Sequence, residues 1–375
     1  MEVVEFSSLA TDNGKTIGVA TLNSERSLNA LSLDMVALLE PKLQQWRDDP
    51  QVVCVWLQGA GEKAFCAGGD IVAMYKAMQQ RPGKVVSEVE DFFTREYRLD
   101  YLIQTFPKPF VVWGSGFVMG GGMGLMNGAS HRIVTETSRL AMPEVSIGLY
   151  PDVGGTYFLN RLTDGLGLFL GLTGAQMNAS DALHVQLADY FVPSSNKPDV
   201  LAQLQSLEWG DTPALNRQKL SDALQSIEQA GRSELPRSGL KARHTELVAA
   251  LQGQDVETVV ANILALDAGD DVWLQRAQKN LRQGCPMTAH IVWAQLQCGT
   301  ELSLAECFQM ELTLSVNCAV KGDFAEGIRA LLIDKDQQPK WHYPSVAEVP
   351  AEAVDEMFVS PWSADAHPLA DLAKG

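Results

Sequence analysis

The sequence predicts an α/β fold followed by a helical C-terminal region. Up to about residue 197, short apolar runs typical of buried strands alternate with segments that carry apolar residues at helical spacing. This alternation indicates βα units joined by right-handed crossovers. Beyond that point the strand-like runs disappear and helical patterns follow one another. Because 375 residues exceed the usual size of one domain, we predict a core at 1–200 and a mainly helical region at 201–375.

The first predicted elements are a strand, a helix and a second strand. Residues 17–22 have the composition of a strand. Ser32 is a suitable N-cap for a helix that runs to about residue 48, because apolar side chains recur there at helical spacing. The apolar run 52–57 then suits a strand that is buried on both faces.

The next part of the core contains two glycine-bearing loops. Residues 63–70 leave the second strand as a loop, and Asp70 can cap a helix that reaches about residue 78. A helix near 86–105 and a buried strand at 108–113 follow. That strand runs into the glycine-rich stretch 114–122, and residues 131–134 form a further strand. The C-terminal helices are predicted near 213–230, 239–252, 255–266, 271–283, 287–297 and 302–320.

Charge excludes one class of partner. With 29 basic and 46 acidic residues, the chain carries a formal net charge of −17. A surface of this sign repels phosphate backbones, so we expect no nucleic acid partner. Coenzyme A is also anionic, and its binding would require a local basic patch.

The cysteines and the N-terminal residues predict a cytoplasmic protein. The six cysteines are scattered without CxxC or zinc spacing, which fits a reducing compartment and no bound metal. The first residues are acidic and lack the basic segment and apolar run of a signal peptide. No stretch reaches the ~20 apolar residues that span a bilayer, so we expect no membrane partner.

Common nucleotide-binding and nucleophile motifs lack glycines that they require. A dinucleotide-binding GxGxxG that began at Gly114 would need a third glycine at 119, which is Met119. A nucleophile elbow around Ser115 would need glycines at 113 and 117, which are Trp113 and Phe117. We therefore predict neither a nucleotide cofactor nor a serine nucleophile.

Two glycine-bearing turns remain, at 66–70 and 119–122, and each follows a buried strand and opens a helix. Such a turn leaves free backbone N–H groups at the positive end of a helix. Two of these groups aimed at one point would form an oxyanion hole. The alternative is that the glycines only permit tight turns and close helix packing.

These turns resemble the two oxyanion motifs of the crotonase (enoyl-CoA hydratase/isomerase) superfamily. Residues 63–71 are similar to the first motif and 116–122 to the second, and 27–32 look like the segment near which CoA adenine packs. The resemblance implies a spiral of ββα units. It also implies that the N–H groups of Gly69 and Gly121 form the oxyanion hole.

The carboxylates narrow the resemblance to one branch of the superfamily. Hydratases carry a glutamate two places after the glycine triplet, where this chain has Gly124. The second hydratase glutamate is present as Glu144, and Asp152 stands where hydratases usually have a small residue. Residues 141–158, 92–97 and 324–341 are similar to the 3-hydroxyisobutyryl-CoA hydrolase branch, in which Glu96 matches a substrate-contacting glutamate.

The resemblance implies an acyl-CoA thioester hydrolase of valine catabolism that acts on a short branched 3-hydroxyacyl-CoA. Glu144 would act as nucleophile or general base. Asp152 would orient water or the substrate hydroxyl, or donate a proton. Glu96, Gly121, Glu144 and Asp152 would bind the substrate, and no cofactor is needed because coenzyme A is part of that substrate.

Other interpretations stay open at this point. The chain could be an enoyl-CoA hydratase or isomerase, or a catalytically silent crotonase-fold binding module. Asp152 could be the N-cap of a helix near Val153, and Glu96 could belong to a solvated helix face. The assembly state is also open: superfamily members often form homo-oligomers through helical C-terminal parts, and this longer tail could instead fold back on its own core.

Overall fold

The computed structural model describes residues 2–372, and its contacts divide the chain into two compact units. Unit 1 comprises 1–69, 102–140 and 177–241, and unit 2 comprises 70–101, 141–176 and 242–375. Each unit gathers segments that are far apart in the sequence, so a single boundary along the chain cannot describe the division. The boundary predicted near residue 200 lies within a helix of unit 1.

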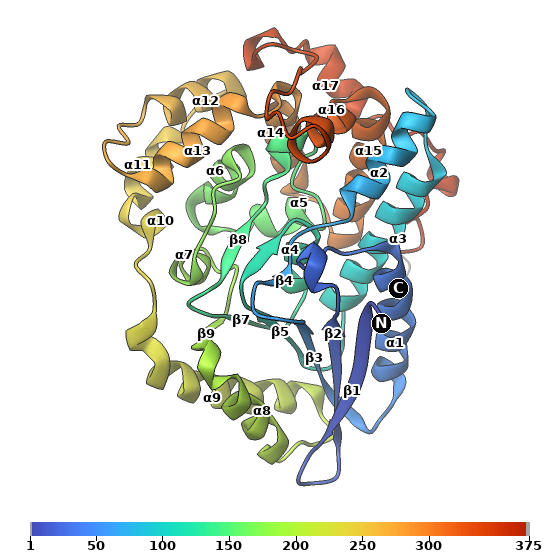
Figure 1. Ribbon diagram of the computed structural model, residues 1–375, viewed down its shortest axis with the longest axis vertical. Helices are drawn as coiled ribbons and strands as arrows, with labels where there is room; N and C mark the ends of the chain where they lie inside the picture. Colours follow the sequence, from blue (N-terminus) through green and yellow to red (C-terminus); the bar gives the residue numbers. More distant parts are fainter. Residues whose placement is uncertain (1, 373–375) are drawn as a thin grey trace. The chain divides into compact units, whose positions relative to one another are not determined.

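Unit 1 is built on a six-stranded sheet with the order β1-β2-β3-β5-β7-β9 (Figure 1). The β1–β2 pair is antiparallel and the other pairs are parallel. The strands are β1 (Val4–Ala10), β2 (Thr16–Leu22), β3 (Val52–Gly59), β5 (Phe110–Gly114), β7 (His131–Val134) and β9 (Tyr190–Phe191). The apolar runs at 52–57 and 108–113 thus lie in central parallel strands, as their composition predicts.

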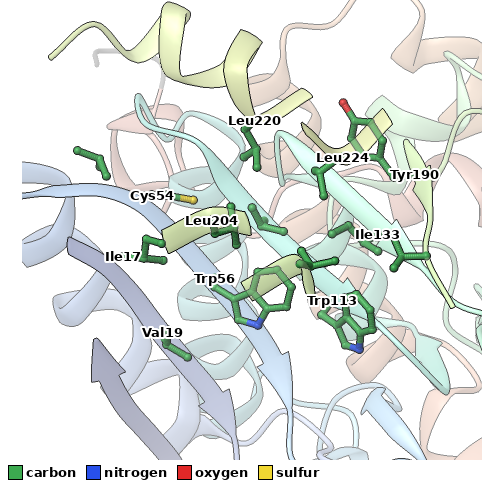
Figure 2. Packing of buried hydrophobic residues seen from close by; sticks show 14 of the residues in the cluster. Ile17, Val19, Cys54, Trp56, Trp113, Ile133, Tyr190, Leu204, Leu220 and Leu224 are labelled. Atoms are coloured by element: carbon green, nitrogen blue, oxygen red, sulfur yellow. The ribbon is translucent and has the colours of Figure 1, made fainter. Parts of the chain in front are cut away.

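Helices α8 (Lys197–Ser206) and α9 (Pro213–Gly231) cover one face of this sheet. Leu204 of α8 and Leu220 and Leu224 of α9 belong to the same buried cluster as Trp56 and Trp113 of the central strands (Figure 2). Helix α1 (Leu33–Asp48) packs on β1, β2 and β3. The predicted cap is confirmed, because Ser32 Oγ accepts a hydrogen bond from the N–H of Met35 at 3.2 Å.

A second, three-stranded sheet has the order β4-β6-β8, formed by β4 (Ala64–Cys66), β6 (Phe117–Met119) and β8 (Arg139–Ala141). Two of these strands lie inside the segments that the sequence predicts as loops. Three residues are too short for a periodic pattern to be recognised. The remaining helices of unit 1 are α4 (Gly121–Asn127), α7 (Ala179–His184) and most of α10 (Gly239–Ala242).

Unit 2 is helical. Helices α5 (Gly155–Leu159) and α6 (Leu166–Thr173) pack against α14 (Pro286–Gly299), and α5 also packs against α15 (Leu304–Lys321). The other helices are α2 (Ile71–Gln80), α3 (Ser87–Gln104, whose last three residues belong to unit 1), α11 (His244–Ala250), α12 (Val256–Ala265), α13 (Val272–Gln283), α16 (Phe324–Ile328) and α17 (Ala351–Met357). The C-terminal helical patterns of the sequence therefore correspond closely to helices of the structure.

Candidate active site

The two glycine turns meet at one edge of the small sheet in unit 1. Strands β4 and β6 are parallel neighbours, with Ala64 opposite Phe117 and Cys66 opposite Val118. Because the carboxyl ends of parallel neighbours lie at the same edge, the turns that follow them leave the sheet together. The first turn is fixed by the N–H of Leu31, which donates to the carbonyl of Gly68 at 2.7 Å.

Glycine is required in both turns. A Cβ atom on Gly122 would lie 2.2 Å from the carbonyl oxygen of Cys66, so the second turn packs directly against the backbone of the first. Gly68 and Gly120 have φ angles of +110° and +48°, which side-chain-bearing residues rarely adopt. Tight packing, the alternative that the sequence left open, is therefore part of the explanation for these glycines.

The same turns also present free amides. Gly121 is the first residue of α4, where a helix has no internal partner for its N–H. Within residues 2–372, neither the N–H of Gly69 nor that of Gly121 donates a hydrogen bond to another group. Close packing and donor availability are thus compatible, and unit 1 brings both predicted oxyanion residues to one edge.

Unit 2 brings the three predicted carboxyl groups together. Glu96 comes from α3, Glu144 opens the 3-10 helix Glu144–Ile147, and Asp152 lies in the turn before α5. Their exposed fractions are 2 %, 4 % and 4 %. Glu96 is therefore not on a solvated helix face, and the N-cap of α5 is Gly154 rather than Asp152.

The Glu144 turn is held by close backbone packing. A Cβ on Gly327 of α16 would lie 2.3 Å from the backbone of Ile147, so only glycine allows this approach. The N–H of Cys285, just before α14, donates to the carbonyl of Val145 at 2.9 Å. Within the described part of the chain, Glu144 Oε2 is buried and has no hydrogen-bond partner. One oxygen of this carboxyl group thus remains available to a substrate or to water.

The Asp152 turn is held by side chains from three helices. Tyr97 of α3 donates from its hydroxyl to Asp152 Oδ2 at 2.7 Å. Gln295 of α14 donates to the carbonyl of Pro151 at 2.7 Å. Glu311 of α15 accepts the N–H groups of Gly154 and Thr156 at 2.7 and 2.8 Å. This turn is therefore anchored on both sides of Asp152.

Burial and like charge raise the pKa values of the three carboxyl groups. Burial raises the pKa of Asp152 to about 7, although the hydrogen bond from Tyr97 acts in the opposite direction. The pKa values of Glu144 and Glu96 are raised well above the ordinary range by burial and then by the charge of Asp152. The group therefore retains at least one proton near neutral pH, which supplies both an acid and a base.

Several residues of this cluster were not predicted as site residues. Asp100, one helical turn after Glu96 on α3, is 1 % exposed, and neither of its oxygens has a partner among residues 2–372. Glu311, Tyr97, Tyr150 and Ser315 complete the cluster. A signal was present in the sequence, because Glu96 and Asp100 share a helix stripe with the aromatic residues Phe93 and Tyr97. Acids on an apolar stripe indicate a buried site.

Within residues 2–372, no three His, Cys, Asp or Glu side chains are grouped so that they could hold a metal ion. The chemical capacity of the cluster is proton transfer and nucleophilic attack by carboxylates.

Comparison with known proteins places this chain in a family. Residues 17–358 match the family model for enoyl-CoA hydratase/isomerase. The mitochondrial 3-hydroxyisobutyryl-CoA hydrolase of Danio rerio is 39 % identical over 92 % of this chain and 87 % of its own. The human protein of the same name is 35 % identical over 93 % of this chain and 87 % of its own.

Solved structures agree with the predicted fold. An enoyl-CoA hydratase from Rhodobacter sphaeroides superimposes with a TM-score of 0.80 at 33 % identity, covering 95 % of this chain and 97 % of that one. A carnitinyl-CoA dehydratase from Mycobacterium thermoresistibile gives 0.82 at 31 % identity, covering 98 % of both chains. The prediction of a crotonase-type α/β fold with a helical C-terminal region is confirmed.

The predicted cytoplasmic location is wrong, because the curated relatives are named as mitochondrial proteins. The prediction depended on scattered free cysteines and on the lack of secretory features in the first residues. Reduced cysteines fit any reducing compartment, and a signal-peptide test concerns secretion alone. Separately, none of the helices in residues 2–372 has the length and apolar character needed to cross a membrane.

Proposed function

We propose that this chain, which belongs to the enoyl-CoA hydratase/isomerase family, hydrolyses 3-hydroxyisobutyryl-CoA to 3-hydroxyisobutyrate and free CoA. The observation that carries the proposal is the similarity to curated hydrolases of that name over more than nine tenths of the chain. This activity would place the protein in valine catabolism. Beyond the CoA carried by the substrate, the reaction needs no cofactor.

The carboxylate pattern supports a hydrolase over a hydratase. Gly124 stands where hydratases of the family carry an acid, and glycine cannot transfer a proton. The two remaining acids, Glu144 and Asp152, are buried together and affect each other's ionisation. A thioester hydrolase needs one group that acts at the carbonyl carbon and a second that manages protons.

Two routes use these groups and give the same products. The first route starts from the form of the coupled pair in which Asp152 holds the shared proton: ionised Glu144 takes a proton from water as the water oxygen attacks the thioester carbon. In the second, Glu144 attacks that carbon itself and forms an acyl-glutamyl anhydride, which water then opens. In both routes the carbon–sulfur bond breaks, and the proton held by Asp152 passes to the departing thiolate.

The remaining residues act by binding. By the family pattern, the N–H groups of Gly69 and Gly121 would stabilise the tetrahedral oxyanion, an effect worth about 3–4 kcal/mol for each donor. Glu96, Glu144 and Asp152 would contact the hydroxyacyl group. Burial leaves these carboxyl groups without competing water, so a hydroxyl group on the substrate is a suitable partner for them.

Thiol release tests the proposal. The wild-type protein is given 3-hydroxyisobutyryl-CoA, acetyl-CoA and crotonyl-CoA, and free CoA is measured with a thiol reagent. We expect rapid release from the hydroxyacyl ester and slow release from the other two. Two similar proteins of known structure are named as a hydratase and a dehydratase, so hydration of crotonyl-CoA is measured in parallel. Faster hydration than hydrolysis would favour a hydratase, and binding without turnover would favour a silent module.

A further inference from the structure

The turn that presents Asp152 is strained. Val153 has a φ angle of +52°, a conformation that a β-branched residue rarely adopts, and Gly154 follows with +86°. Val153 is also 3 % exposed. Such strain persists only where the surrounding structure holds it in place. The contacts that hold this turn therefore decide where the Asp152 carboxyl group lies.

One side chain makes a double contact with this turn. Glu311 of α15 is fully buried, and its two oxygens accept the N–H groups of Gly154 and Thr156 at 2.7 and 2.8 Å. These two amides lie on the C-terminal side of the strained residue and open α5. Each oxygen of the Glu311 carboxyl group thus accepts one backbone N–H, so a single side chain bridges the two amides.

We propose that Glu311 is a positioning residue for the hydrolysis, which clamps the strained turn so that Asp152 is held in its working position. Glu311 acts through the backbone of the turn and does not itself meet the substrate. The inference depends on the proposed function only for its kinetic readout. The contact between Glu311 and the turn at 152–156 does not depend on which reaction the protein catalyses.

The tests compare Glu311→Gln, Val153→Gly and the double variant. Glutamine keeps the size of the side chain but can accept only one of the two N–H groups and turns its NH₂ toward the other. We expect kcat for 3-hydroxyisobutyryl-CoA to fall by about tenfold to a hundredfold while KM stays within about threefold, because a misplaced catalytic group costs rate more than binding.

Val153→Gly removes the strain, because glycine adopts positive φ without cost. If the clamp works against this strain, the loss caused by Glu311→Gln should be markedly smaller in the Val153→Gly background. The cavity left by the missing valine side chain is present in both Val153→Gly and the double variant, so it cancels from the loss measured between those two proteins. An equal loss in both backgrounds, or an unchanged kcat in Glu311→Gln, would overturn the proposal.

A control on the same helix separates positioning from stability. Asn317 of α15 is also buried and donates to two backbone carbonyls, those of Met357 and Val359 at 2.8 and 2.9 Å. Asn317→Leu should lower the melting temperature without lowering kcat. If Glu311→Gln behaves as this control does, its role is structural and the clamp is wrong.

Two further measurements cover a variant that does not fold and test the clamp without an activity assay. If Glu311→Gln does not fold, Glu311→Asp, which keeps the carboxyl group but shortens the reach, replaces it in both backgrounds. Hydrogen exchange of the backbone amides in 150–158 should be faster when Glu311 is changed, and this readout needs no activity. A wild-type protein that cleaves no thioester would end the proposed function, whereas unchanged exchange at Gly154 and Thr156 would end the clamp.

Discussion

The hydroxyl of Tyr97 lies 2.7 Å from the carboxyl group of Asp152, and it begins a line of buried hydroxyl groups. Tyr97 Oη is 2.6 Å from Ser315 Oγ, which is 2.8 Å from Tyr150 Oη. The Tyr150 hydroxyl in turn donates to the backbone carbonyl of Glu311. These are four hydrogen bonds, but the three hydroxyl groups supply only three protons. All four are complete only when Asp152 contributes a proton of its own.

Ser315→Ala should therefore lower the pKa of Asp152. Without Ser315, two hydrogen bonds remain, and Tyr97 and Tyr150 can make both while Asp152 is ionised. If protonated Asp152 serves the leaving thiolate, activity falls as pH rises through its pKa, which is about 7 in the folded protein. The alkaline limb of the kcat/KM profile should then move to lower pH by about one unit, equivalent to one hydrogen bond.

The control for this shift is Thr313→Val, which removes another buried hydroxyl of α15 that donates to the carbonyl of Gln309. Its alkaline limb should match that of the wild-type protein. A limb that stays in place or moves upward in Ser315→Ala would contradict the proton count.

Asp100→Asn should stabilise the protein at pH 8 but not near pH 4. Burial, and then the charges of Glu96, Asp152 and Glu311, raise the pKa of Asp100 well above its ordinary value. Between the unfolded and folded pKa values, the unfolded chain has lost its proton while the folded protein keeps it. The unfolded state then binds fewer protons, so stability falls as pH rises through this window. Below the pKa that Asp100 has in the unfolded chain, Asp100 is protonated in both states, and this loss of stability is absent.

Asparagine does not ionise in either state, so the variant avoids this loss. Urea unfolding of both proteins at pH 4 and pH 8 provides the test. The gain in the free energy of unfolding should grow between these pH values by about 1.4 kcal/mol for each unit of pKa difference. A gain of the same size at both pH values would show that Asp100 ionises normally in the folded protein.

Gly122→Ala should disrupt unit 1. The added Cβ would meet the carbonyl oxygen of Cys66 at 2.2 Å, and a backbone atom in a paired strand cannot move aside easily. We expect a loss of about 1–3 kcal/mol in the free energy of unfolding together with loss of thiol release. Gly210→Ala is the matched control in the same unit, since the nearest atom to its Cβ is 3.8 Å away. Equal melting temperatures of the two variants would refute the close packing of the turns.

The sequence predicts the long elements well and the short ones poorly. Helix α1 carries a periodic pattern over its length and strand β3 contains the apolar run 52–57, and both are found where predicted. Strands β4, β6 and β8 have only three residues each, which is too few for a period to appear. Each of the two compact units combines segments that are separate in the sequence, so the division between them is visible only when the chain is folded.

For the candidate site, the sequence predicts residues in local motifs but not contacts between distant segments. The motifs around Gly69, Gly121, Glu144 and Asp152 are local, and they could be read from adjacent residues. Glu311 contacts a turn more than 150 residues earlier in the chain, and no local pattern links the two. Its sequence signal is weak: a single acid among buried residues of α15 that are otherwise uncharged.

The measurement that tests the central claim most directly compares thiol release from 3-hydroxyisobutyryl-CoA by the wild-type protein and by Glu144→Gln. Glutamine keeps the shape of the side chain but can neither accept a proton from water nor form an anhydride. If Glu144 acts at the thioester carbon, the wild-type protein releases CoA rapidly, and kcat of the folded variant falls by at least about a hundredfold. A variant that folds and retains the wild-type rate would contradict the account.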